Sequence, residues 1–137
     1  MNVIYYMQCF YQSSDAFFDF IGISFDYQLI GKTSIMTLGS NIDYRSELLR
    51  GERLSTTSRL LDWDHSKVHL YFETWNSEHD RLAANAEILF LYVNLQSRKS
   101  EKFQVDTREK LAEVHSAHRR LETPATINRS LGIRRKD

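Results

Sequence analysis

The chain has 137 residues, of which 42% are hydrophobic and 26% are charged, and this composition is ordinary for a single globular domain. Its 18 Lys and Arg residues balance its 18 Asp and Glu residues, so the chain lacks the basic excess typical of nucleic-acid-binding proteins. No apolar stretch approaches the roughly 20 residues that a membrane-spanning helix needs. We therefore expect one domain, residues 1–137, with no nucleic-acid partner and no membrane partner.

The sequence contains one cysteine, Cys9, which excludes an intrachain disulfide framework. Met1 is not followed by the basic and apolar regions of a secretory signal. Both observations predict a cytoplasmic protein, because a reducing compartment suits a chain without disulfides.

Apolar residues in the N-terminal segment recur at spacings of three and four, which is the period of a helix. Asn2 is a good N-cap residue and Gly22 is a good stop signal. We therefore predict a central helix within residues 1–22, about 30 Å long at about 1.5 Å per residue. Its buried stripe is heavily aromatic and consists of Val3, Met7, Phe10, Ser14, Phe17 and Ile21.

Residues 32–97 contain four segments rich in apolar and β-branched residues, separated by polar turns. A helix of about 30 Å is matched by strands of roughly nine residues, so these segments predict an antiparallel sheet of four long strands that wraps the helix. Short turns predict that strands adjacent in sequence pair as hairpins. The last strand is apolar on both faces at residues 88–93, which predicts a partner subunit or a second layer over the sheet.

A second helix is predicted at residues 106–121, with Leu111, Val114 and Ala117 on one side and a basic tail after it. The predicted fold class is therefore α+β: a long central helix, an antiparallel sheet of four long strands and a C-terminal helix.

Three short runs carry a family resemblance through their order and spacing. They are M-N-V-I-Y-Y at residues 1–6, Y-R-S-E-L at residues 44–48 followed by G-E-R-L, and A-A-N-A-E at residues 83–87. Together they resemble the motifs of the hotdog-fold acyl-CoA thioesterases. The resemblance is closest to the branch of 4-hydroxybenzoyl-CoA thioesterase, which includes members found near carnitine and betaine metabolism. It covers residues 1–97 and, more loosely, the C-terminal helix and tail.

The resemblance implies a hotdog fold that hydrolyses a small or medium acyl-CoA without a cofactor. It also implies a homodimer or homotetramer, with the site between subunits near the start of the long helix. Family members of this kind carry D-Y-N-G-H-M-N-x-x-Y-Y, with a first strand before the helix and the catalytic aspartate in the loop between them. The counterparts of that strand and that aspartate would precede Met1, so the catalytic residue is unknown.

Two explanations stay open for this difference: translation that begins upstream of Met1, or a naturally short chain that has lost or moved its catalysis. Two functions accordingly stay open, an acyl-CoA thioesterase and a non-catalytic hotdog protein that binds acyl-CoA or serves assembly only. A dehydratase of the same fold is the weaker interpretation, because it would need a histidine near the helix and none lies there.

Thioester hydrolysis needs a carboxylate that attacks or activates water, and donors for the developing oxyanion. The first turn of the helix would supply N–H donors, and Asn2 is either a substrate contact or only a cap. The resemblance places Tyr5 and Tyr6 in an acyl pocket, although an aromatic stripe is also typical of a core. The other substrate-binding candidates lie on or just after the first strand: Ser40, Asn41, Tyr44 and Glu47.

Glu87 lies inside an apolar strand, so it is either a functional carboxylate or one that is paired structurally. The histidines form two close pairs, His65 with His69 and His115 with His118, and neither has the spacing of a metal site. We therefore expect no metal.

Overall fold

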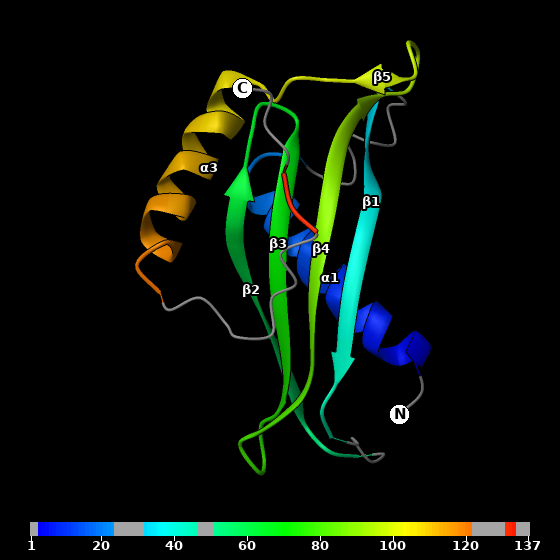
Figure 1. Ribbon diagram of the computed structural model, residues 1–137, viewed down its shortest axis with the longest axis vertical. Helices are drawn as coiled ribbons and strands as arrows, with labels where there is room; N and C mark the ends of the chain where they lie inside the picture. Colours follow the sequence, from blue (N-terminus) through cyan, green and yellow to red (C-terminus); the bar gives the residue numbers. More distant parts are fainter. Residues whose placement is uncertain (1–2, 24–31, 47–50, 122–130, 134–137) are drawn as a thin grey trace.

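The computed structural model describes residues 3–23, 32–46, 51–121 and 131–133. Helix α1 (Val3–Phe20) and the sheet form two layers, and helix α3 (Val105–His118) lies beside strand β2 (Leu54–Trp63) (Figure 1). The predicted helices and the four long strands are confirmed, whereas the two-residue strand β5 was not predicted. In chain order the elements are α1 (Val3–Phe20), β1 (Thr33–Tyr44), β2 (Leu54–Trp63), β3 (Lys67–Asn76), β4 (Arg81–Asn94), β5 (Lys99–Ser100) and α3 (Val105–His118).

Helix α1 ends at the glycine that the sequence indicated. Gly22 has a φ of 95°, a left-handed conformation that favours glycine. The N–H of Ile23 donates to the carbonyl oxygen of Phe18 at 2.8 Å, and the N–H of Gly22 donates to that of Asp19 at 3.1 Å. This pair of bonds is a Schellman motif, and it turns the chain back toward the sheet so that Ile23 joins the core.

The strands follow the spatial order β1-β4-β3-β2, and every pairing is antiparallel. The prediction that consecutive strands pair is therefore right for β2 with β3 and for β3 with β4. It is wrong for β1, which pairs with β4 instead of β2. With β1 on one side and β3 on the other, both hydrogen-bonding edges of the long strand β4 are paired, so this apolar strand is not left at an edge of the sheet.

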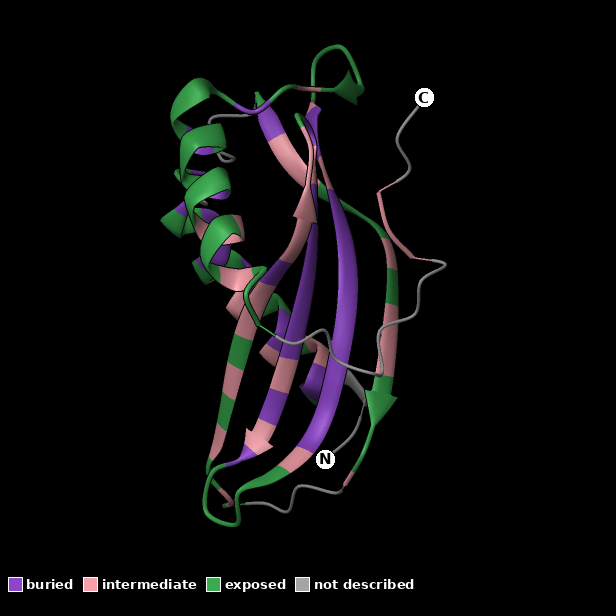
Figure 2. Cartoon of the chain, turned by 60° about the vertical axis from the view of Figure 1, so that its left-hand side comes forward, coloured by how far each residue is buried: buried purple, intermediate pink, exposed green. Residues whose placement is uncertain are grey.

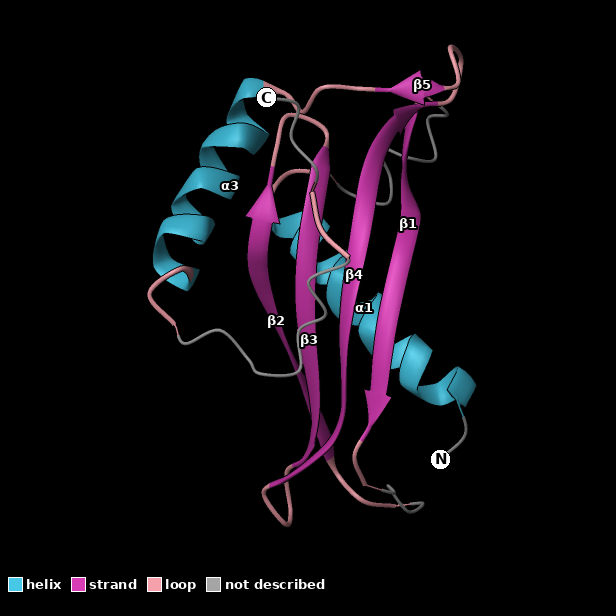
Figure 3. Cartoon of the chain, viewed as in Figure 1, coloured by secondary structure: helices cyan, strands magenta, loops and turns pink. Residues whose placement is uncertain are grey.

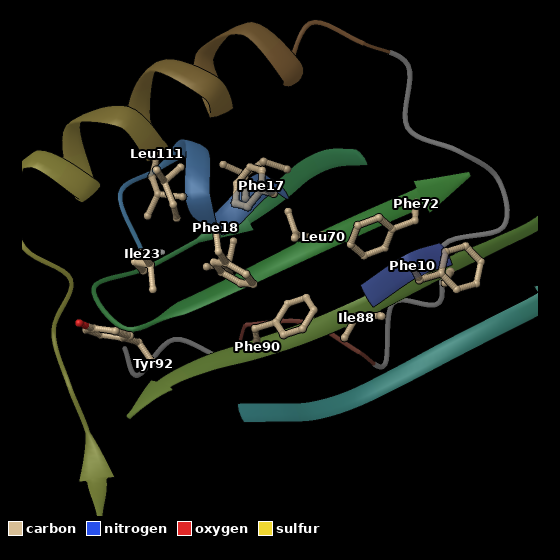
Figure 4. Close-up of a cluster of buried hydrophobic side chains, with 14 of the residues drawn as sticks. Phe10, Phe17, Phe18, Ile23, Leu70, Phe72, Ile88, Phe90, Tyr92 and Leu111 are labelled. Atoms are coloured by element: carbon tan, nitrogen blue, oxygen red, sulfur yellow. The ribbon is translucent and has the colours of Figure 1, made fainter. Parts of the chain in front are cut away.

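The main core lies between α1 and the sheet (Figure 4). Phe10 of α1 packs on Phe72 of β3 with ring centroids 5.9 Å apart, and Phe18 meets Phe90 of β4 edge-on at 5.1 Å. Alternate residues of β3 and β4 face the helix because successive side chains of a strand point to opposite faces. The cluster also includes Ile21, Val68, Leu70, Ala86, Ile88 and Leu111.

The opposite face of β4 is also buried along most of its length (Figure 2). Part of its cover is the chain's own C-terminal segment, residues 131–133. A Cβ atom added to Gly39 of β1 would lie 2.9 Å from the Cδ1 of Leu131, so the Leu131 side chain lies against this part of the sheet. The predicted second layer is therefore supplied in part by the same chain. Among the described residues, no helix is long and apolar enough to cross a bilayer.

Candidate functional site at the start of helix α1

The beginning of α1 lies beside the end of β1 at one end of the sheet (Figure 3). The hydroxyl of Tyr6 donates to the carbonyl oxygen of Ser46 at 3.2 Å. Its ring meets that of Tyr44 edge-on, with centroids 5.2 Å apart. Tyr6 is 4% exposed whereas Tyr44 is 48% exposed, so the inner ring is fixed in the core and the outer ring faces solvent.

The residues that follow β1 are held in place by β4. The N–H groups of Arg45 and Ser46 both donate to the carbonyl oxygen of Ala83, at 2.8 and 3.1 Å. The hydroxyl of Ser46 donates to the carbonyl oxygen of Leu82 at 2.9 Å. Because these bonds leave little freedom at the chain end, they position the side chains of Tyr44 and Arg45.

Arg45 brings a positive charge to this end of the sheet. Its Nε donates to the Oδ1 of the buried Asn85 at 3.2 Å, and its Nη2 lies 3.5 Å from the Oδ2 of Asp43. The Arg45 and Asp43 side chains are 41% and 52% exposed, so an incoming anionic or polar group can reach them. Neither Arg45 nor Asn85 was predicted as a site residue. The available signals were the position of Arg45 inside the Y-R-S-E-L run and an asparagine within an apolar strand.

The sequence-predicted site residues are only partly brought together. Tyr5 is 56% exposed on the first turn of α1, next to Tyr6 in the chain. Ser40 pairs with Ile88, so it shares the helix-facing side of β1 with Tyr44, roughly 13 Å further along the strand.

Asn41, by contrast, pairs with Glu87 and points to the opposite face of the sheet, away from the tyrosines. Asn2 and Glu47 lie outside the described residues.

Glu87 has a partner on the face of the sheet away from α1. Its Oε1 lies 3.1 Å from the Nε2 of His69, and the two side chains are only 3% and 7% exposed. The structural pairing that the sequence left open for Glu87 is therefore present. Among the residues that the structure describes, no group of three or more His, Cys, Asp or Glu side chains could hold a metal ion.

Comparison with known proteins identifies the family. Residues 1–111 match the model of the thioesterase-like superfamily. The chain belongs to this superfamily. Its fold is also that of solved thioesterase-like proteins. A Staphylococcus aureus protein solved in complex with CoA has a TM-score of 0.87 and 22% identity, over 98% of this chain and 84% of that one.

Another solved relative in fold is a DHNA-CoA thioesterase from Staphylococcus aureus, with a TM-score of 0.77 and 13% identity. The structural alignment covers 87% of this chain and 81% of that one. These likenesses establish the hotdog fold that the sequence motifs implied.

Curated relatives share more sequence. The L-carnitine dehydrogenase/betainyl-CoA thioesterase of Rhizobium meliloti (strain 1021) is 29% identical over 130 residues, which is 95% of this chain. The chain spans only 26% of that longer relative. The betainyl-CoA thioesterase of Pseudomonas aeruginosa is 23% identical over 129 residues, 94% of this chain and 81% of the relative.

Proposed function

We propose that this protein hydrolyses the thioester of a small acyl-CoA, and that betainyl-CoA is the substrate class to test first. The observation that carries the proposal is the match of residues 1–111 to the thioesterase-like superfamily. Two relatives aligned over nearly the whole chain have betainyl-CoA thioesterase in their names. The fold likeness to a protein solved with CoA supports a CoA thioester as the ligand.

The end of the sheet described above supports this chemistry in three ways. Helix α1 begins here, and the positive end of a helix dipole suits a developing oxyanion. The exposed rings of Tyr44 and Tyr5 offer aromatic surface, which attracts quaternary ammonium groups such as the betainyl group. Arg45, which bonds to Asn85 on the face of the sheet away from α1, offers a cation for phosphate oxygens. The carboxylate that attacks or activates water is unassigned.

The edge strand β1 supports a site shared between subunits. It is 12 residues long and ends at the exposed Tyr44, and it also exposes Met36 (51%) and Leu38 (46%). A long edge strand with apolar side chains is a template for pairing with a second chain. We infer a homodimer in which two β1 strands meet, so that the Tyr44 end of one subunit faces its partner.

Substitution at Tyr44 tests the assignment of the site. Tyr44→Ala should lower kcat/KM for betainyl-CoA by about tenfold, because the exposed half of the aromatic pair is lost. Release of the CoA thiol, measured with DTNB over a panel of acyl-CoAs, gives the rate. Tyr11→Ala is the matched control, because Tyr11 is also partly exposed on α1 (38%) but lies about 9 Å further along the helix than Tyr5. Equal loss in both variants would contradict this assignment.

Thiol release also separates hydrolysis from the second candidate function, acyl-CoA binding without turnover. Two observations favour that second function: Asp43 is paired with Arg45, and Glu87 is buried with His69, both on the face of the sheet away from α1. No thiol release with any acyl-CoA, together with calorimetric binding of a non-hydrolysable acyl-CoA thioether, would contradict hydrolysis and support acyl-CoA binding without turnover.

The oligomeric state tests the inferred dimer. Sedimentation equilibrium should give twice the 16.2 kDa mass of the chain. The double substitution Met36→Lys and Leu38→Lys should give the monomer mass, because charged side chains on an edge strand oppose strand pairing. Val105→Lys, at a position 58% exposed on α3, should leave the mass unchanged. A monomeric wild type would exclude the dimer.

A further inference from the structure

The second edge of the sheet is closed by a side chain instead of a strand. β2 stands last in the order β1-β4-β3-β2, and in the described part of the chain no strand pairs with its outer side. The N–H of Leu60, in the middle of this strand, donates to the Nδ1 of His118 at 2.9 Å. Next to it, the Nη2 of Arg59 donates to the carbonyl oxygen of Leu121 at 2.8 Å. These two bonds hold the C-terminal end of α3 on β2.

The two halves of α3 are attached differently. Leu111, in its middle, is fully buried and belongs to the core, and Thr107 is also buried. The last turn contributes Val114 and His118, which line a groove of about 480 Å³ between α1, β2 and α3. Because His118 lines a groove, water and protons can reach it, whereas the buried half of the helix is anchored by apolar contacts.

The hydrogen bond to Leu60 depends on the protonation state of His118. An imidazole nitrogen accepts a hydrogen bond only when it carries no proton. Protonation of Nδ1 would place one N–H group against another and would add a positive charge beside Arg59. The bond therefore requires neutral His118.

In the described part of the chain, the groups that shift the pKa of His118 are a cation and a second histidine, and no carboxyl is among them. Burial, then Arg59 on β2, then His115 on α3 lower the pKa of His118 below its ordinary value. Burial raises the pKa of Glu73, and Arg59 lowers it by a smaller effect, so this carboxyl interacts with Arg59.

The other residues that line the groove have side chains that do not titrate between about pH 5 and about pH 8. The α1 side consists of Ser13, Ala16, Phe17 and Phe20, and the β2 side adds Thr56 and Ser58.

We propose that His118 is a pH-sensitive latch, in which protonation releases the last turn of α3 from β2 and opens the strand edge and the groove. The latch is the hydrogen bond between Leu60 and His118. Because the folded-state pKa of His118 is lowered, the latched form is fully favoured above the ordinary histidine pKa of about 6.5. It is lost progressively as the pH falls below that value toward the lower folded-state pKa. The buried Leu111 keeps the first half of α3 in place.

Amide hydrogen exchange of Leu60 tests the latch directly. The protection factor, which is corrected for the intrinsic effect of pH, should fall by about tenfold or more between about pH 7.5 and about pH 5. The amide of Leu70, in the central strand β3, should keep its protection at both values and serves as the internal reference.

Three variants separate the latch from general acid instability. His118→Asn can present an amide oxygen near the position of Nδ1 and does not titrate, so the fall in Leu60 protection should disappear. His118→Ala should leave Leu60 weakly protected at both pH values. His115→Gln removes the neighbouring histidine and should retain the fall. A wild-type protection factor that is equal at both pH values, or a full fall in His118→Asn, would overturn the proposal.

Discussion

Replacement of Phe72 by alanine should lower the free energy of unfolding by about 3–5 kcal/mol. Phe72 is fully buried in β3, packs on Phe10 of α1 and lies opposite Ala86 of β4. Because Ala86 is too small to fill the space, the substitution leaves a cavity between the helix and the sheet. Urea denaturation followed by circular dichroism, at one fixed protein concentration, measures the change.

An exposed phenylalanine provides the control for this substitution. Phe20 is 61% exposed at the end of α1, so Phe20→Ala should change the free energy of unfolding by less than about 0.5 kcal/mol. A loss below about 1 kcal/mol for Phe72→Ala would mean that the helix does not pack on β3 as described.

Breaking the buried pair of His69 and Glu87 should have the next largest effect. His69→Leu should cost about 3 kcal/mol, because it removes a hydrogen-bond partner from a buried carboxylate. Replacing both residues by leucine should cost much less than the two single substitutions together, because no polar group at this pair then needs a partner. A double-mutant cycle of His69→Leu and Glu87→Leu should therefore give a coupling above about 1 kcal/mol.

The exposed pair of Asp43 and Arg45 serves as the comparison. Both side chains are about half exposed, so solvent screens their attraction. Asp43→Asn should change the free energy of unfolding by less than about 1 kcal/mol. Additive single substitutions at His69 and Glu87 would show that the two side chains do not interact in the folded protein.

Features that depend on residues close together in the sequence were predictable, whereas features that depend on distant residues were not. The bounds of α1 were predictable, because the apolar period and the stop at Gly22 are local signals. The pairing of β1 was not, because the tendency to form a strand is local whereas the choice of neighbour depends on the whole sheet. The contact between Leu60 and His118 joins residues 58 positions apart, so no sequence pattern could indicate it.

The candidate site shows the same division. Tyr5, Tyr6 and Tyr44 were predicted from short motifs, and the rings of Tyr6 and Tyr44 meet at one end of the sheet. The bond from Arg45 to Asn85 depends on the register of β1 with β4, which places Asp43 opposite Asn85. The partner of Glu87 likewise depends on the register of β3 with β4. Residue type could single out Glu87, but only the register of the sheet could identify His69 beside it.

The position of β1 beside β4 also sets the order in which the protein can fold. β2, β3 and β4 form a meander whose hairpins close over short turns. β1 can join the sheet only after β4 has formed, because even its nearest pair, Tyr44 with Ala84, joins distant parts of the chain. During synthesis, α1 and its aromatic side leave the ribosome before the strands that bury them exist. Contacts between such distant residues slow folding. The nascent chain therefore exposes the aggregation-prone apolar side of α1 for longer than a fold with mainly local contacts would.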